Sequence, residues 1–260
     1  MRRFVLIWVV AVSCASVASA QFSPIPLGSH NPLGVPDYLE PVGDVIPLEF
    51  YDWLDVQLPE MTPLDLDSLP PSVGQEIHFT EPSDVWMTFV HEGAGMRNSV
   101  GYYTYDTGSP PHRPEVIDSA YSVFPNFSAV DSGGGLESGD KVYLGNFAAG
   151  TSLGTYLTQN GWNTSAMDTF FATAFFNPES DPALRRHVVS IYNEEYDLFA
   201  TSFEDINREG NSDDDFNDAV FYLTIEGEAY TGAQTVPEPS ALLLAFAGLL
   251  LFALQRRRIA

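Results

Sequence analysis

The chain has 260 residues, of which 35 are acidic and 11 basic, so its formal net charge is −24. This balance excludes the basic footprint that nucleic-acid binding requires, and it disfavours contact with anionic membrane surfaces. The single cysteine, Cys14, excludes an internal disulfide framework.

The first 20 residues have the pattern of a secretory signal peptide. Two arginines precede an apolar run at 4–12, and Ala18-Ser19-Ala20 closes the segment. A positive start, a short apolar core and an A-x-A end predict cleavage by signal peptidase after Ala20. A buried N-terminal helix and lipidation at Cys14 are the alternatives.

Residues 21–83 form a proline-rich region that holds 11 of the 19 prolines. Prolines at this density prevent long helices and central strands. An apolar patch lies within the region at Leu48, Phe50, Tyr51, Trp53 and Leu54. We therefore expect extended structure with one or two short ordered pieces packed on the main domain, and full disorder is the alternative.

Residues 84–227 are predicted to be an all-β module, an antiparallel, jelly-roll-like β-sandwich. Strand-like runs rich in β-branched and aromatic residues alternate with Gly, Pro, Asn and Asp clusters. No stretch of ten or more residues shows a clear helical apolar period with caps. The segment 154–161 fits either a short helix or a strand. The predicted strands are 85–90, 99–105, 120–124, 141–144, 169–176, 186–192 and 219–225.

An acidic loop at 203–218 concentrates the candidate chemistry. Asp213, Asp215 and Asn217 are spaced i, i+2, i+4, which can aim several oxygens at one centre, as Ca²⁺ requires. The loop is not an EF-hand, because that motif needs Gly at its sixth position and Glu at its twelfth, where this chain has Asp218 and Thr224. A solvated acidic turn without a cation is the alternative interpretation. Further candidate ligands are Glu204, Asp205, Asp218 and, across the sheet end, Glu92.

The segment from Val85 to Ile225 resembles the domain-of-unknown-function family 4114 of exported bacterial proteins. The blocks that carry the likeness are Glu92-Gly-Ala-Gly95 with Asn98–Tyr103, Gly134–Asp140, Gly150-Thr with Asn160-Gly161, and Phe203-Glu-Asp205 with Asp213–Phe221. The resemblance implies a β-rich exported module, and the family's acidic pattern suggests Ca²⁺ binding. It implies no established biochemical activity.

The C-terminus, after a linker at 228–235, combines a short motif, an apolar run and a basic end. The apolar run at about 240–254 is predicted to be a transmembrane helix near the lower length limit, with the arginines on the cytoplasmic side. A plain tail anchor is the alternative. The residues of the segment 236–258 that carry the pattern are Val236, Pro237, Glu238, Pro239, Arg256, Arg257 and Arg258.

This tail resembles the PEP-CTERM sorting domain of Gram-negative bacteria. The resemblance implies recognition by exosortase, a membrane enzyme thought to cleave the tail, and delivery to the cell surface or extracellular matrix. Without both targeting segments, residues 21–240 keep all 35 acidic and only six basic residues, a net charge of −29. Such a surface suits soluble export and divalent cations.

Together these features predict an exported, non-enzymatic cell-surface or matrix protein with a calcium-stabilised β-module. Its membrane contact would be transient, through the C-terminal helix before processing. The expected partners are signal peptidase and exosortase during export, then exopolysaccharide or matrix, and no nucleic acid. A carbohydrate-binding module is the alternative function, and a secreted hydrolase is a third.

Overall fold

The computed structural model describes residues 22–69, 75–117, 119–163, 167–210 and 212–232. The predicted signal peptide with its cleavage site at Ala20, and the predicted sorting tail with its transmembrane helix, lie outside the described residues. In the described part, no helix has the length and apolar character needed to cross a membrane.

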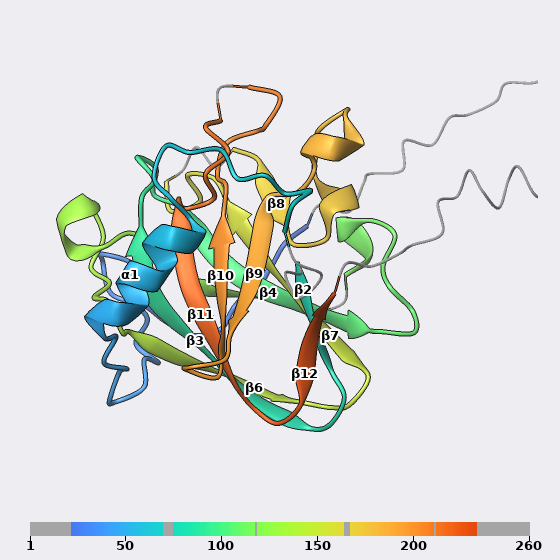
Figure 1. Ribbon diagram of the computed structural model, residues 1–260. Coiled ribbons are helices and arrows are strands. Elements are labelled where there is room, and N and C mark those ends of the chain that lie inside the picture. The colour runs from blue at the N-terminus through green and yellow to red at the C-terminus, as the bar shows by residue number, and fades with distance from the viewer. Residues whose placement is uncertain (1–21, 70–74, 118, 164–166, 211, 233–260) are drawn as a thin grey trace, which may run out of the picture.

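Two β-sheets face each other and form an open, sandwich-like architecture (Figure 1). The seven-stranded sheet has the order β1-β5-β4-β7-β2-β12, with β8 also paired to β7, and the five-stranded sheet has the order β6-β3-β11-β10-β9. Only the short β1–β5 pair is parallel among the pairings of the described strands. The expected all-β class is therefore confirmed.

The strands are β1 (Ile25–Pro26), β2 (Glu76–Phe79), β3 (Ser83–Glu92), β4 (Ser99–Asp106), β5 (Ser119–Phe124), β6 (Lys141–Phe147), β7 (Thr151–Thr158), β8 (Thr169–Phe171), β9 (Val188–Asn193), β10 (Leu198–Phe203), β11 (Ala219–Glu226) and β12 (Ala229–Gly232). One α-helix, α1 (Leu48–Gln57), and four 3₁₀ turns, Pro114–Val116, Val130–Ser132, Ala174–Phe176 and Pro182–Leu184, complete the described elements.

The main core lies between the two sheets and follows the period-2 alternation of their strands. Val85, Met87 and Phe89 of β3 are each at most 1% exposed, and they pack with Phe221 and Leu223 of the antiparallel neighbour β11. The opposite sheet contributes apolar residues of β2, β4, β5, β7 and β8 to the same cluster. Because β10 and β11 are antiparallel neighbours in this packed sheet, the loop that joins them lies at one end of the sandwich.

Six of the predicted runs coincide with a strand whose ends differ by up to three residues, and the run 169–176 is wrong beyond its third residue. Its first three residues form β8, but the chain then turns into a 3₁₀ segment at Ala174–Phe176. The Asn177 side chain caps the end of this strand, because it accepts a hydrogen bond from Phe171 N (2.7 Å) and donates one to Phe171 O (2.9 Å). The run 186–192 begins as a strand only at Val188, after the buried His187.

Several strands arise where the sequence pattern predicted none or left the choice open. The ambiguous segment 154–161 belongs to strand β7 as far as Thr158. The strand β10 lies in a stretch that was not predicted at all. At the margins, β2 comes from the proline-rich region and β12 from the expected linker, and these two strands pair with each other. The sandwich therefore extends beyond the predicted limits 84–227 at both ends.

The helix α1 is one ordered piece of the proline-rich region. It fits between Pro47 and Pro59, and it places Phe50, Leu54 and the following Leu58 on one side at i, i+4, i+8. These three residues are buried against the outer face of the five-stranded sheet in a second apolar cluster. The helix was missed because its apolar stripe is short and its N-cap, Pro47, forms no side-chain cap.

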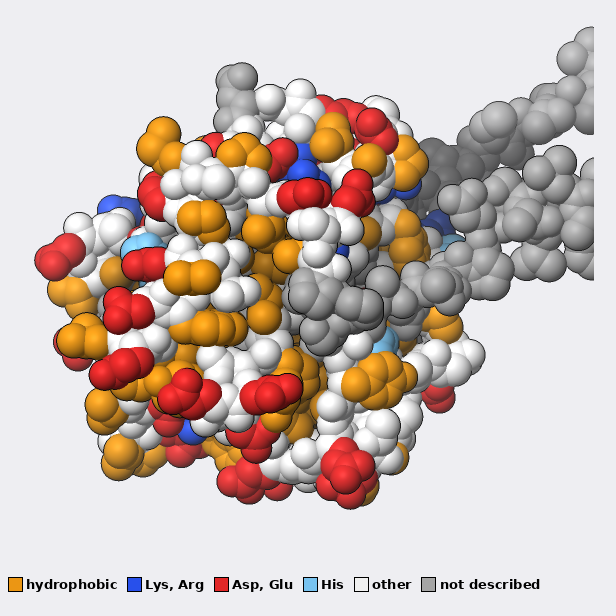
Figure 2. Space-filling view, in the orientation of Figure 1, with side chains coloured by type: hydrophobic (Ala, Val, Ile, Leu, Met, Phe, Trp, Pro, Cys, Tyr) orange, Lys and Arg blue, Asp and Glu red, His pale blue; other side chains and the backbone are white. Residues whose placement is uncertain are grey.

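The surface agrees with the acidic composition. In the view of Figure 2, acidic side chains are scattered over the visible face, whereas Lys and Arg side chains are few. Three of the six basic residues of the region between the targeting segments have acidic partners: Arg113 with Glu115, Lys141 with Asp44, and Arg208 with Asp214.

Candidate cation site

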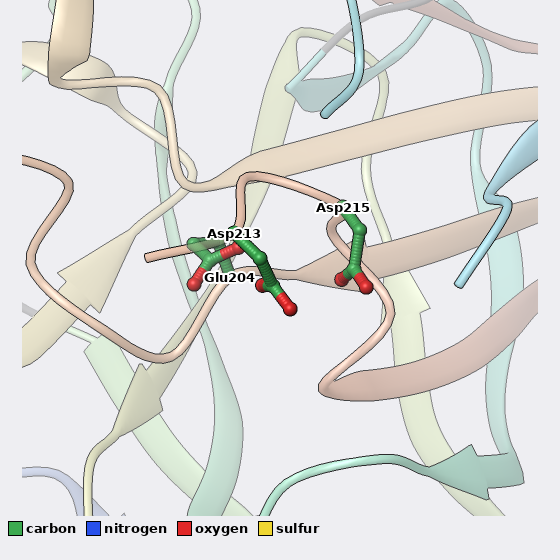
Figure 3. Close-up of side chains that lie close together, drawn as sticks. All are labelled: Glu204, Asp213 and Asp215. Carbon is green, nitrogen blue, oxygen red and sulfur yellow. The ribbon is translucent and has the colours of Figure 1, made fainter. Parts of the chain in front are cut away.

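The candidate site lies in the loop that joins β10 to β11. Register fixes both ends of this loop, because Phe203 at the end of β10 pairs with Ala219 at the start of β11. Glu204 follows β10 directly, and Asp213 and Asp215 lie on the returning half of the loop. Figure 3 shows these three carboxylates gathered together, although Glu204 and Asp213 are nine positions apart in the sequence.

Two residues in the left-handed region shape the returning half of the loop. Asp214 and Phe216 both have φ of 60°. Asp tolerates this conformation, but for a bulky ring it is a costly outlier that surrounding structure must hold in place. The Phe216 ring is fully buried in the second apolar cluster, and the Arg208 guanidinium lies 5.3 Å from its centroid. Arg208 also donates to Asp214 Oδ1 at 2.6 Å, so it fixes both residues.

The carboxylates of Glu204, Asp213 and Asp215 each offer an oxygen within 4.8 Å of the others. Glu204 is completely buried and Asp215 is 2% exposed, whereas Asp213 is open to solvent. Neither Glu204 oxygen has a hydrogen-bond partner among the described residues. Buried polar atoms are almost always paired, so this carboxylate lacks the partner that its environment requires.

The electrostatic environment also disfavours a charged Glu204 carboxylate that has no partner. Burial, together with the nearby charges of Asp213 and Asp205, raises the pKa of Glu204 to about 7, although Ser212 opposes the rise. The Ser212 hydroxyl donates to Asp214 Oδ1 at 2.8 Å, so it does not satisfy Glu204. Without a cation, the ionised form of Glu204 is therefore destabilised at neutral pH.

The proline-rich region supports the loop from outside. The Met61 amide donates to Asp215 Oδ2 (2.8 Å), and the Leu64 amide donates to Asp214 O (2.8 Å). The Asn217 side-chain amide donates both to Asp215 Oδ2 (3.0 Å) and to Glu60 Oε2 (2.7 Å). We call residues 60–64 the brace.

The remaining predicted ligands lie nearby but are engaged with protein groups. Asp205 accepts from Asn98 Nδ2 at 2.6 Å, and Asp218 Oδ2 accepts from the Asp205 amide at 2.9 Å. Burial and the charge of Asp205 raise the pKa of Asp218 to about 8. Glu92, at the end of β3, accepts a hydrogen bond from the Ser132 hydroxyl. Of the seven predicted ligands, the structure thus brings three oxygens together and places Asp205, Asp218, Glu92 and Asn217 around them.

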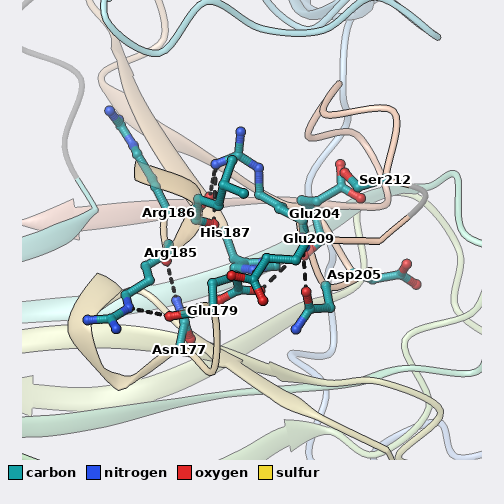
Figure 4. Close-up of polar contacts among 12 residues, drawn as sticks. Asn177, Glu179, Arg185, Arg186, His187, Glu204, Asp205, Glu209 and Ser212 are labelled. Atoms are coloured by element: carbon teal, nitrogen blue, oxygen red, sulfur yellow. Dashed lines mark hydrogen bonds and ion pairs between the residues drawn. The ribbon is translucent and has the colours of Figure 1, made fainter. Parts of the chain in front are cut away.

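A polar network supports Glu204 from the other side, as Figure 4 shows. The buried His187 ring bonds Glu204 O through Nδ1 (2.8 Å) and Glu179 Oε1 through Nε2 (2.8 Å). The ring also stacks on Phe170 with centroids 3.9 Å apart. Because both ring nitrogens have protein partners, His187 positions the main chain at Glu204.

The donor set fits a hard divalent cation. Three carboxylates supply up to six oxygens, which matches the oxygen preference of Ca²⁺ and its six to eight ligands. The unpaired oxygens of Glu204 would receive a partner, and the like charges of the three groups would be offset. Asp213 gives the cluster contact with solvent, through which an ion and water ligands can enter.

Sequence reasoning missed the brace and the His187–Glu179 pair. The sequence indicates Asn98 only as part of a family-like block, and nothing in it predicts the contact with Asp205. No spacing in the sequence links Glu60 to Asn217, which are 157 positions apart. The signal that did work was the alternation Asp213, Asp215, Asn217, which marks residues on one side of a turning loop.

Comparison with known families agrees with both resemblances. Residues 235–258 match the PEP-CTERM protein-sorting motif, so this is an exported, cell-envelope-associated protein that is a substrate for exosortase processing. Residues 147–226 match the family Domain of unknown function (DUF4114). That segment runs from the end of β6 through β11 and contains all three clustered carboxylates. No curated protein and no solved structure matches the chain.

Proposed function

We propose that this exported protein is a non-enzymatic component of the cell surface or extracellular matrix, with a jelly-roll-like sandwich that Ca²⁺ stabilises. The ion would be held by Glu204, Asp213 and Asp215. Asp205, Asp218, Glu92 and Asn217 would supply surrounding negative charge and hydrogen bonds. After exosortase processing, the protein would reside outside the membrane.

The observation that carries the proposal is the buried, unpartnered Glu204 carboxylate beside two further carboxylates. A solvated acidic turn would leave these oxygens exposed to water, but Glu204 is fully buried. Protonation alone would relieve the charge but would still leave a buried group without a hydrogen-bond partner. A bound cation meets both requirements at once.

Thermal melting of the full-length chain in nonionic detergent tests the proposal. The chain is melted with a chelator, with Ca²⁺ and with Mg²⁺ at equal ionic strength. A bound ion stabilises the folded state by about 2.7 kcal/mol at 100 times its Kd, which for a domain of this size is about 5–10 °C. An unchanged melting temperature up to millimolar Ca²⁺ would contradict the proposal.

Sorting is tested separately. Replacing Pro237, Glu238 and Pro239 by alanine should block tail processing and retain the protein in the membrane fraction. The unaltered protein should reach the surface or the medium in a shorter form. Equal processing of both proteins would contradict the assignment of these residues to recognition.

A further inference from the structure

A cleft of about 560 Å³ lies at the end of β11 away from the acidic loop, where the two sheets end beside each other. The edge strand β12 of one sheet forms one wall, and the ends of β9, β10 and β11 of the other sheet form the second. Its volume falls within the roughly 300–1,000 Å³ of small-molecule sites.

Two exposed tyrosines line the cleft. Tyr192 of β9 is 39% exposed and Tyr230 of β12 is 51% exposed, so neither ring is consumed by the core. Each ring nevertheless contacts a second ring. Tyr192 contacts Phe199 with centroids 5.0 Å apart, and Tyr230 contacts His78 at 5.0 Å. The cleft is therefore lined by an aromatic side chain from each of the two sheets.

The charged groups of the cleft are acidic. Asp197, in the β9–β10 turn, accepts a hydrogen bond from the Tyr192 hydroxyl at 2.6 Å, and Glu228 precedes β12. No lysine or arginine is among the described residues that line the cleft. An anionic ligand would meet uncompensated repulsion here. A cation would be attracted by both carboxylates and by the negative faces of the rings.

We propose that this cleft binds a protonated organic amine. The ammonium group would lie between Asp197 and Glu228, and the carbon skeleton that carries it would contact the faces of Tyr192 and Tyr230. An amino-sugar polymer and a free polyamine share this chemistry. The proposal is independent of the Ca²⁺ site, because no residue of the cleft belongs to the acidic loop.

Calorimetric titration of the full-length chain in nonionic detergent and 150 mM NaCl tests the cleft. Three probes are compared: a glucosamine hexamer, an N-acetylglucosamine hexamer of equal length, and spermidine. The two hexamers share a backbone and differ in charge. We expect the glucosamine hexamer or spermidine to bind, and the N-acetylated hexamer to bind at least tenfold more weakly. Whichever amine binds more tightly identifies the source of the ligand.

Two variants locate the binding. Tyr230→Ala removes an exposed ring, and Asp197→Asn removes a charge at a residue with φ of 50°, a conformation that Asn accepts readily. Each should weaken amine binding at least tenfold with an unchanged melting temperature. Tyr143→Ala and Glu194→Gln, an exposed tyrosine and an exposed acid outside the cleft lining, are the matched controls.

Three results would overturn the proposal. If no probe binds, the cleft has no affinity for organic amines. If the N-acetylated hexamer binds as tightly as the glucosamine hexamer, the cleft recognises a neutral saccharide. If the cleft variants bind the amines as tightly as the control variants do, the interaction is adsorption to the acidic surface. A missing Ca²⁺ response would leave these expectations unchanged.

Discussion

The substitution Glu204→Gln should have opposite effects with and without Ca²⁺. Glutamine keeps the size of the side chain and removes its charge. Burial raises the pKa of Glu204 from 4.5 to about 7, and at about 1.4 kcal/mol per pKa unit this corresponds to about 3 kcal/mol. Above pH 7 in chelator, the ionised glutamate destabilises the fold by this order of magnitude, and glutamine does not.

The sign follows from proton linkage. A carboxyl group with a raised folded pKa binds its proton more tightly when folded, so stability falls as pH rises from 4.5 through about 7. At pH 8 in chelator, the Glu204→Gln protein should therefore melt about 6–12 °C higher than the unaltered protein. In saturating Ca²⁺ this difference in melting temperature should shrink or change sign, because only the unaltered protein gains stability from the ion.

Melting followed by circular dichroism at pH 8 checks this crossover. Glu194→Gln makes the same chemical change at an exposed site outside the loop and should melt like the unaltered protein in both conditions. Asp213→Asn is a second loop variant that alters an exposed ligand and should lose the Ca²⁺ response without strain in the core. If Glu204→Gln retains the full Ca²⁺ shift, or if it destabilises the metal-free protein, the assignment of the unpaired carboxylate is refuted.

Three further expectations concern the brace, a second buried acid and the loop. Ca²⁺ should slow hydrogen exchange at the Met61 and Leu64 amides, because both donate to the acidic loop. Equal exchange rates in Ca²⁺ and in chelator would show that ion binding does not affect the brace. Burial raises the pKa of Glu76, so stability should fall as pH rises above 4.5 and Glu76→Gln should flatten that fall in melting curves. Phe216→Ala should cost about 3–5 kcal/mol in denaturant unfolding, because it empties a fully buried site, and a loss below 1 kcal/mol would show that the ring does not hold the loop.

The strands were predictable to the extent that their own residues determine them. The run from Val85 to Val90 is rich in β-branched and aromatic residues, and this composition alone predicts the strand that the structure contains. By contrast, β2 and β12 are four-residue strands that exist because they pair with each other, and β2 also pairs with β7. Such strands depend on partners distant in the chain, so the local sequence pattern does not predict them.

The sequence predicts the local part of the candidate site but not the contacts between residues distant in the chain. The spacing of Asp213 and Asp215 reflects local loop conformation, which a sequence can carry. Glu204 joins them because of the Phe203–Ala219 register, and its lack of a hydrogen-bond partner depends on what surrounds it in space. Asn217 is expected to be a ligand through its side-chain oxygen, and the structure shows its side-chain nitrogen donating to Asp215 and Glu60.

The three carboxylates and the brace differ in their relation to the family match. Glu204, Asp213 and Asp215 lie inside the matched segment 147–226, whereas Glu60 and Met61 lie far outside it. The proposed cation ligands therefore lie in the segment that matches the family, whereas the brace lies in the proline-rich region outside it. Because the Met61 amide of the brace donates to Asp215, an ion that orders this carboxylate would also tighten the hold on the segment after α1. Binding at the loop would then stabilise the apolar cover of the five-stranded sheet as well as the loop itself.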